Sequence, residues 1–597
     1  MAQGMFLFTV TLKKKKLIVF SPDDTNTSCS AGDPLDVARS IIDRDIARLE
    51  DSIRALKYRR NELSPISRLP AEILCNIFSL VEDNSIFRNP KSWTNFSQVS
   101  QHWRSSALSA PELWSNIPLS YPRWAREMLT RSKMAKLTIR SGHSLGTFNP
   151  RTIETVRLCL HEMNRVEEID ITTILTLDEI FRDLPKSAPQ LHTLCIRSHS
   201  FHLAETAFSI HEDFLYDTDR LQRVELIKCK ISWDSRLLTG LTHLSLEDSL
   251  KANSSIVQVL HALQRMPALT NLHLKDSIPD DSEGASTYPV ADLPCLRVLR
   301  ISSGVGALTT VLRHITFPHS AILNLTCKET QSTQIDFSNF LSVLATKFLT
   351  SLRIRSLSLK ILGTQTHGLE FHFWTTAIIR DCFPSSLGSA QLELVLSWSS
   401  PQPHNHVKAL TCAFDAMSLP FLNQLRISTS DVIDSRTWVK TFGKLPLLER
   451  VCVQNYATHS FLEALVYKRK AAEKSKIAYR NVSFPKLRYI HLEGTDFDGA
   501  ISGSISIDML LDCLMERCER KAEVRVLRLD DCYYISSDDV ERLEEIVVDV
   551  IWDGVEQEVS THYDSEEEKD YDEDGNTIDL DYDYDDYDDY DGFYVGW

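Results

Sequence analysis

A short pattern of leucines recurs along most of this 597-residue chain and limits its fold more than any other feature. The pattern is LxxLxLxx, in which the L positions are apolar and the x positions are mostly polar. Alternation of this kind is typical of a β-strand with one buried face. Nine segments fit: "PQLHTLCIRS", "DRLQRVELIKC", "TGLTHLSLEDS", "MPALTNLHLKDS", "LPCLRVLRISS", "LPFLNQLRIST", "LPLLERVCVQN", "FPKLRYIHLEG" and "AEVRVLRLDDC".

The spacing of these segments indicates a repeat architecture. The first leucines of the first five lie 30, 20, 28 and 27 residues apart, at Leu191, Leu221, Leu241, Leu269 and Leu296. This is the period range of leucine-rich repeats, in which each repeat supplies one strand and one helix. We therefore expect an α/β fold with a leucine-rich-repeat solenoid over residues 135–556.

Helices are expected between the strands, on the convex side of the solenoid. "SSIVQVLHALQRM", residues 254–266, is one such stretch, with Ile256, Val257, Leu260 and Leu263 on one face. The fit to the repeat is poorest over residues 307–419. There "SLRIRSLSLK" and "SAQLELVLSW" suggest strands at irregular intervals, which predicts insertions or missed repeats.

A long amphipathic helix is expected over residues 34–64. Asp33 is a candidate N-cap, and Pro34 suits the first helical position. Apolar residues follow at alternating steps of three and four, interrupted only by Arg60: Ile42, Ile46, Leu49, Ile53, Leu56 and Leu63. This coiled-coil-like seam must pack on something. Three heptads are marginal for independent dimerisation, so packing on a neighbouring domain is the commoner outcome, and both alternatives stay open.

A second, shorter apolar helix is expected in "SRLPAEILCNIF", residues 67–78. Pro65 ends the preceding helix, and Pro70 suits the first turn of the next. Another helix is expected in "WTNFSQVSQHWRSSAL". Two or three small helices bury little apolar surface by themselves, so the remainder must find a partner inside or outside the chain.

Charge is concentrated at the C-terminal end. Residues 564–591 hold 16 acidic residues and one lysine, a net charge of −15 out of −17 for the whole chain. The rest is nearly neutral, which argues against a basic nucleic-acid groove. We expect residues 557–597 to be a disordered acidic tail. Its EF-hand-like stretch, residues 570–581, ends in Asp581 rather than Glu, so we expect only weak, nonspecific cation binding.

Residues 1–33 are expected to be irregular. Their "MFLFTVTLKKKKLIVF" fits neither a signal peptide nor a spanning helix, so no membrane partner is expected. The basic runs at residues 13–16 and 467–476 are more typical of solvated loops or helix faces than of import signals. Thirteen scattered cysteines without a CxxC pair favour reduced thiols in the cytoplasm or nucleus.

Motifs of catalysis are absent from the sequence. No phosphate loop, HExxH pair, GxSxG elbow or GxGxxG turn occurs, and no Cys, His and carboxylate cluster has metal-site spacing. We therefore expect a non-enzymatic protein with no catalytic residues, metal or cofactor. A hydrolase hidden in the irregular stretch 307–419 stays open as an alternative, and a pocket of converging titratable residues there would favour it.

The two N-terminal helical segments resemble a known family. "SPISRLPAEILCNIFSLV", followed by "FSQVSQHWRSSALSAPELW", resembles the F-box motif in the form found in a large fungal, basidiomycete-type group of F-box proteins. The specific parts are the Leu-Pro start, the apolar stripe and the "VSQHWR" signature. On this resemblance residues 65–118 are the F-box, and residues 119–134 form a connecting helix to the repeats.

The resemblance implies a function. F-box helices bind a Skp-type adaptor and, through it, the cullin and RING subunits of an SCF-type ubiquitin ligase. A C-terminal repeat domain selects the substrate protein for ubiquitin-dependent degradation. The matching positions contribute either the adaptor contact or the core beneath it: Leu69, Pro70, Ile73, Leu74, Ile77, Phe78, Val99 and Trp103.

Substrate binding is expected on the concave face of the repeats. Polar side chains that alternate with the buried leucines point to this face, and their mixed charge suits protein recognition. They are His243, Glu247, His273, Lys275, Arg300, Arg426, His491, Glu493, Arg528 and Asp530. The expected function is the substrate receptor of the ligase. The alternative is a leucine-rich-repeat scaffold or binding protein without a ligase role.

Overall fold

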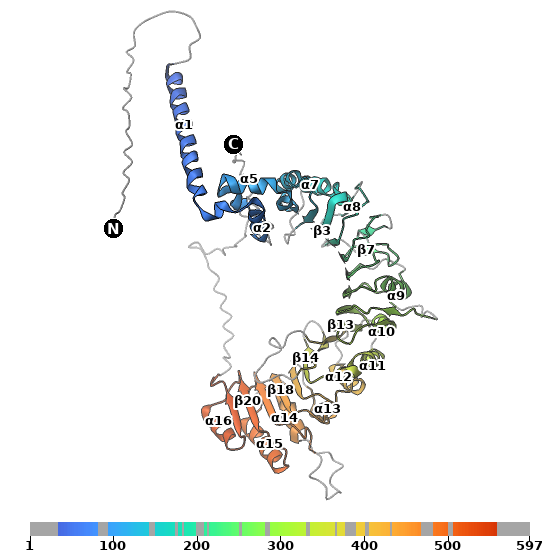
Figure 1. Ribbon diagram of the computed structural model, residues 1–597. Coiled ribbons are helices and arrows are strands. Elements are labelled where there is room, and N and C mark those ends of the chain that lie inside the picture. The colour runs from blue at the N-terminus through green and yellow to red at the C-terminus, as the bar shows by residue number, and fades with distance from the viewer. Residues whose placement is uncertain are drawn as a thin grey trace, which may run out of the picture. The chain divides into compact units, whose positions relative to one another are not determined.

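The computed structural model divides the chain into two compact units, residues 1–114 and 115–597. We call them the helical unit and the sheet unit and describe each separately (Figure 1). The described residues are 34–81, 94–141, 150–173, 177–181, 184–198, 208–211, 214–249, 254–280, 287–329, 335–363, 367–376, 390–399, 405–429, 433–455, 457–466, 482–498 and 505–557. The predicted irregular N-terminus, the acidic tail beyond Gln557 and both basic runs lie outside these ranges.

The helical unit consists of short helices after one long one. Its elements are α1 (Pro34–Glu62), η1 (Pro65–Arg68), α2 (Ala71–Val81), η2 (Thr94–Gln98), α5 (Gln101–Ser109) and η3 (Pro111–Trp114). Pro65 is the first residue of η1, and Pro70 immediately precedes α2. Ser100 caps α5, because its Oγ accepts a hydrogen bond from the backbone N–H of Trp103 at 3.1 Å.

Aromatic packing between α2, η2 and α5 forms the core of the helical unit. The Phe78 ring stacks on Phe96 with 4.3 Å between centroids, and Trp103 lies 5.1 Å away at a tilt. The buried Trp114 donates its indole N–H to the carbonyl of Ala107 at 2.8 Å. Helix α1 differs, because residues 35–60 are all exposed, so the expected packing of its seam is not found within the described part of this unit.

The sheet unit contains a sheet of seventeen strands among its described residues. Backbone pairing gives the order β1-β2-β3-β4-β6-β8-β9-β11-β13-β16-β15-β14-β17-β18-β19-β20-β21. The strands are β1 (Asn116–Pro118), β2 (Leu137–Arg140), β3 (Val166–Thr173), β4 (Thr193–Ser198), β6 (Arg223–Ile227), β8 (His243–Glu247), β9 (Asn271–Lys275), β11 (Val298–Gly304), β13 (Ile322–Glu329), β14 (Ser356–Leu362), β15 (His367–Trp374), β16 (Leu392–Trp398), β17 (Gln424–Thr429), β18 (Arg450–Asn455), β19 (Tyr489–Glu493), β20 (Val526–Asp530) and β21 (Asp549–Trp552).

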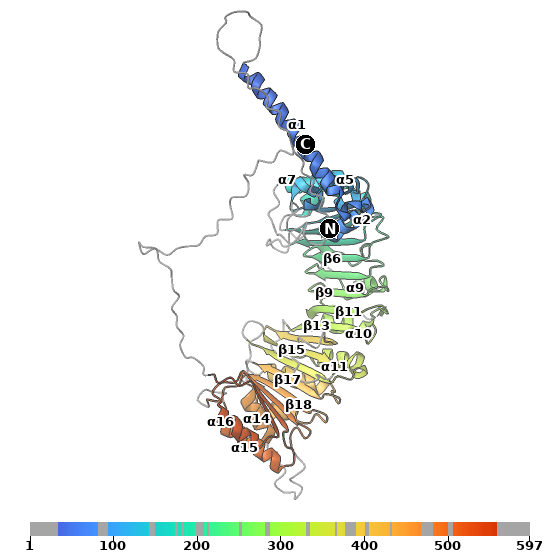
Figure 2. The same ribbon diagram turned by 60° about the vertical axis from the view of Figure 1, so that its left-hand side comes forward.

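Helices follow many of the strands and line one face of the sheet (Figures 1 and 2). They are α6 (Pro122–Arg131), α7 (Pro150–Leu160), α8 (Leu177–Phe181), α9 (Ile256–Gln264), α10 (Val305–His314), α11 (Ser338–Lys347), α12 (Asn405–Ala416), α13 (Ser435–Thr441), α14 (Thr458–Val466), α15 (Ile507–Glu519) and α16 (Ser537–Glu544). We call the opposite face the open face. Short elements complete the unit: η4 (Met163–Arg165), η6 (Leu349–Ser351), and the strand pairs β5 (Ser209–Ile210) with β7 (Lys230–Ile231) and β10 (Ala291–Asp292) with β12 (Ile315–Thr316).

All nine LxxLxLxx segments coincide with strands, β4, β6, β8, β9, β11 and β17 to β20. Their leucine positions are buried beneath the helices, as at Leu269, Leu272 and Leu274. In α9 the buried residue that completes the face is Val259, whereas Val257 is only half-buried. The parallel sheet with alternating helices is consistent with the predicted repeat architecture. None of the helices among the described residues combines the length and apolarity needed to cross a membrane.

Several strands end in the same turn. The residue after the strand has a positive φ, and the next side chain is buried and polar or a thiol. In β8 these are Asp248, with φ of 48°, and Ser249, whose Oγ donates to the carbonyl of Leu226 one strand back at 3.1 Å. The same turn follows β6, β9, β19 and β20, with positive φ at Lys228, Asp276, Gly494 and Asp531. After β8, the hydrogen bond from Ser249 therefore links two neighbouring repeats, in addition to the backbone hydrogen bonds between their strands.

The irregular stretch of sequence contains an inverted insertion. Strands β14, β15 and β16 are consecutive in the chain, but they enter the sheet in reverse order, so β16 pairs with β13 and β14 with β17. The central strand, β15, is antiparallel to both of its neighbours, whereas the other pairings of this sheet are parallel. This insertion explains why the repeat spacing fails between residues 307 and 419. Strand β1, at residues 116–118, is the edge strand of this sheet.

Candidate functional site: an apolar helix stripe and the open face of the sheet

Helix α2 has two apolar faces with different surroundings. Leu74 and Phe78, four residues apart, are fully buried against η2 and α5. Ile73, Ile77 and Leu80, at steps of four and three, keep 45%, 37% and 81% of their surface exposed. We call these last three the α2 stripe. The first two therefore form the core, and the stripe is the surface that a partner can reach.

The remaining residues of the predicted adaptor site flank this helix. Val99 and Pro70 are exposed, while Leu69 and Trp103 are half-buried. Nε2 of His102, on α5, donates to the carbonyl of Leu69 at 3.2 Å, which holds the start of α2 against α5. The helix is further tied to α5 by the Cys75 thiol, which donates to the carbonyl of Ser106 at 3.5 Å. The sequence grouped all eight residues, and the structure separates them into core, flanking contacts and surface.

Sequence reasoning missed Leu80, the most exposed member of the α2 stripe. Its signal was its position seven residues after Ile73, which places both on one helical face. This position was overlooked because both faces of α2 are apolar, so the spacing of Ile73 and Leu80 does not stand out from that of Leu74 and Phe78.

The helical unit combines a buried aromatic core with an exposed apolar stripe on α2, a geometry that suits the docking of another protein. Comparison with known families agrees, because residues 66–120 match the F-box-like family model. The matched segment covers the described helical unit after α1 and extends into β1 of the sheet unit. The chain thus contains an F-box-like domain, and F-box domains typically bind Skp-type adaptors. A comparison with curated proteins finds no match for this chain.

The ten residues predicted to bind substrate all lie on the open face. They occupy strands β8, β9, β11, β17, β19 and β20, at positions that alternate with buried apolar residues. Arg300 is exposed, and Lys275 pairs with Glu247 across neighbouring strands. His273 shares a 3.1 Å hydrogen bond with the hydroxyl of Ser245, and burial lowers its pKa. These residues share one surface, but they differ in their surroundings. Arg300 is exposed to solvent, whereas Lys275 and Glu247 form an ion pair with each other.

An ion-pair group on the earlier strands was not predicted. Arg197 of β4 bridges Asp170 of β3 at 2.5 Å and Glu225 of β6 at 2.7 Å, and Arg223 adds a contact of 3.0 Å to Glu225. Burial alone would raise the pKa of Glu225, but the two guanidinium groups lower it overall. Sequence gave a weak signal here, because "VEEIDITT" of β3 alternates without fitting the leucine template.

Five of the ten predicted residues form two neighbouring groups of contacts on β17, β19 and β20. Arg426 donates to both carboxylate oxygens of Glu493, at 3.2 and 2.9 Å. Arg528 donates through Nε to Asp530 at 2.6 Å, and Nε2 of His491 lies 2.9 Å from the same carboxylate. Burial lowers the pKa of His491 although the nearby carboxylates oppose this. The two groups therefore compensate most of their charge internally.

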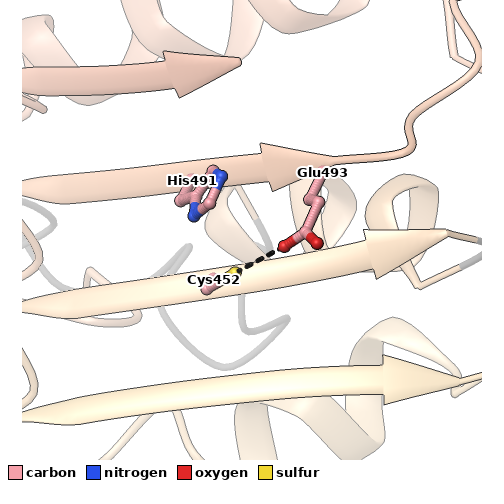
Figure 3. Close-up of side chains that lie close together, drawn as sticks. All are labelled: Cys452, His491 and Glu493. Carbon is pink, nitrogen blue, oxygen red and sulfur yellow. Dashed lines mark hydrogen bonds between the residues drawn. The ribbon is translucent and has the colours of Figure 1, made fainter. Parts of the chain in front are cut away.

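Three ligand-type atoms of this region gather closely. Figure 3 shows Cys452 of β18 facing His491 and Glu493 of β19, and one atom from each lies within 4.8 Å of the others. Two facts argue against a metal centre. Arg426 already holds Glu493, and burial raises the pKa of the Cys452 thiol to about 12, so the thiolate that metals prefer is disfavoured. The cluster is best described as a polar contact between strands.

An open hollow of about 600 Å³ lies between α11 and α12, within residues 307–419, for which the sequence leaves a hydrolase open as an alternative. Its titratable lining groups are Lys408, Cys412 and Asp415, and the Cys412 thiol lies 3.6 Å from the Ser338 hydroxyl. None of the described residues that line it is a histidine, so this hollow has no nucleophile paired with an imidazole base.

Proposed function

We propose that this chain is the substrate-recognition subunit of a cullin-RING, SCF-type ubiquitin ligase. The F-box-like domain binds the Skp-type adaptor, which links the chain to the cullin and RING subunits. The sheet unit is a leucine-rich-repeat solenoid whose open face binds the substrate protein. Ubiquitin transfer is then performed by the partners, and this chain itself is not an enzyme.

The exposed α2 stripe is the observation that carries this proposal. Three large apolar side chains on one helical face, with Val99 also exposed on the same domain, are more than chance surface exposure. Full burial of such side chains contributes about 1.5 to 3 kcal/mol each. Helix recognition commonly uses anchors at steps of three, four and seven residues, which is the spacing of Ile73, Ile77 and Leu80.

Two features of the sheet unit support protein recognition. Several of its described strands end in turns of the form typical of leucine-rich repeats, where a polar or thiol residue follows the strand. Its open face presents side chains of both charges, including the exposed Arg300. All eleven cysteines within the described ranges are free thiols, which suits the proposed location in the cytoplasm or nucleus.

Co-purification with a Skp-type adaptor tests the proposal. The intact chain should retain the adaptor, and the double variant Ile77→Asp, Leu80→Asp should lose it, because two carboxylates would have to be buried in an apolar interface. Val548→Asp is the matched control, since Val548 is an exposed apolar residue outside the F-box-like domain. An intact chain that does not bind the adaptor would favour a repeat scaffold without a ligase role.

A further inference from the structure

Helix α1 carries an apolar seam that no described residue covers. Five large side chains of the seam, Ile42, Ile46, Leu49, Ile53 and Leu56, keep between 48% and 65% of their surface exposed. At 1.5 Å per residue this 29-residue helix is about 43 Å long. An uncovered seam of this length on a long helix needs a partner of matching length.

The order of residues along the seam indicates one partner helix. The steps of four, three, four and three residues place Ile46 and Ile53 at heptad position a, and Ile42, Leu49 and Leu56 at position d. Over residues 42–56 these large apolar residues lie only at positions a and d, which is the narrow seam of a coiled coil rather than the wide apolar face of a helix that packs on several neighbours. The seam alone therefore indicates pairing with a single second helix.

The charges beside the seam are those expected if this second helix is another α1. The e and g positions are acidic in the first half, at Asp43, Asp45 and Glu50, and basic in the second half, at Lys57 and Arg59. A helix with this distribution is complementary to its own reversed copy. No other described helix needs to be invoked for the charges to match.

The same charges also fix the orientation of the pair. Parallel copies would place Asp45 of one helix beside Glu50 of the other on both sides of the seam. In antiparallel copies, Asp43 faces Lys57 and Asp45 faces Arg59, each twice, and Glu50 is the only charged residue of these positions that meets its own counterpart. Antiparallel pairing also sets the helix dipoles in the favourable direction.

We infer that α1 binds α1 of a second copy of this chain as an antiparallel, two-stranded coiled coil. Ile46 then packs against Leu56 of the second copy, and Leu49 against Ile53. The protein is a dimer through this helix, whether or not the F-box-like domain binds an adaptor.

Molar mass in solution tests the dimer on the full chain. Wild-type protein should have twice the 68.1 kDa of one chain, and Leu49→Asp, Ile53→Asp should have the single mass. The control is Ala47→Asp, Ala55→Asp, which adds the same charge to the same helix at exposed positions outside the seam. A monomeric wild type, or a seam variant that stays dimeric, would overturn the inference.

A charge exchange tests the orientation without placing charge in the seam. Chains with Asp43→Lys, Asp45→Lys and chains with Lys57→Glu, Arg59→Glu should each be monomeric alone, and an equal mixture should recover the dimer. In a parallel pair the first variant would instead dimerise more strongly than wild type, because Asp45→Lys would turn the repulsion from Glu50 into attraction. That result, or a mixture that stays monomeric, would refute the antiparallel coiled coil.

Discussion

At the scale of single residues, neighbours along α2 have opposite roles. Leu74 and Phe78 hold the helical unit together, and Ile77 and Leu80 remain free for a partner. The sequence predicted that this helix is too apolar to stay in water. It did not separate the two faces, because which face is buried depends on the position of α5, and a local pattern does not encode that position.

The separation of α2 into a buried face and an exposed face predicts different effects of mutations on stability. Phe78→Ala should lower the free energy of unfolding of the helical unit by about 3 to 5 kcal/mol, because it removes the ring that contacts Phe96 and Trp103. Leu80→Ala should change it by less than about 0.5 kcal/mol. Urea unfolding followed by amide exchange of α2 and α5 measures both, and equal losses would contradict the assignment of core and surface.

A histidine and a glutamate on β15 give a prediction about pH. The imidazole of His372 hydrogen-bonds the Glu370 carboxylate at 2.8 Å, which raises the pKa of His372 and lowers that of Glu370, although burial opposes both shifts. The raised imidazole pKa contributes stability that is complete below its ordinary value of 6.5 and is lost as pH rises through the folded pKa. The lowered carboxyl pKa contributes stability that is present above 4.5 and lost as pH falls through the folded pKa.

The melting temperature of wild type should therefore exceed that of His372→Gln most between about pH 4.5 and 6.5. The difference should shrink on the alkaline side, as the imidazole loses its proton. Thermal unfolding of both chains across this range measures the difference, and one that does not vary with pH would show that the pair does not titrate as described.

At the scale of elements, the parallel strands were predictable and the inverted insertion was not. Each LxxLxLxx segment shows its buried face by alternation within a few residues, as in "LTNLHLK" of β9. The reversed order of β14, β15 and β16 depends on which distant strands pair, and parallel and antiparallel partners leave the same local alternation. Strand β15 itself was missed for a simpler reason, since "HGLEFHFW" does not fit the leucine template.

One glycine of this insertion should be intolerant of a side chain. A Cβ on Gly368 of β15 would lie 2.6 Å from the backbone oxygen of Leu396 on β16, closer than strands can accommodate without moving. Gly368→Ala should therefore lower stability by about 1 to 3 kcal/mol in chemical unfolding. Gly306→Ala in α10 is the control, because nothing lies within 4 Å of its Cβ. Equal stability of the two variants would argue against the tight β15 to β16 contact.

At the scale of the whole molecule, the two proposed binding surfaces lie on two separately compact units. The helical unit presents the α2 stripe, which consists only of large apolar side chains and suits a single partner such as an adaptor. The sheet unit presents charged residues on parallel strands, and much of that charge is already paired, as in the ion pairs Arg426–Glu493 and Arg528–Asp530. The polar residues that alternate with leucine were predictable from the sequence. Their pairing was not predictable, because it joins residues up to 67 positions apart in the chain.

The central claim is that the α2 stripe is the adaptor-binding surface, and the affinity of the Leu80→Asp variant tests it most directly. Leu80 is the most exposed residue of the stripe, so its replacement should leave the melting temperature unchanged. The dissociation constant of the complex between the full chain and a Skp-type adaptor, measured by calorimetry, should rise about 30-fold or more, as expected for an interface hot spot. An unchanged dissociation constant in a folded Leu80→Asp protein would contradict the account.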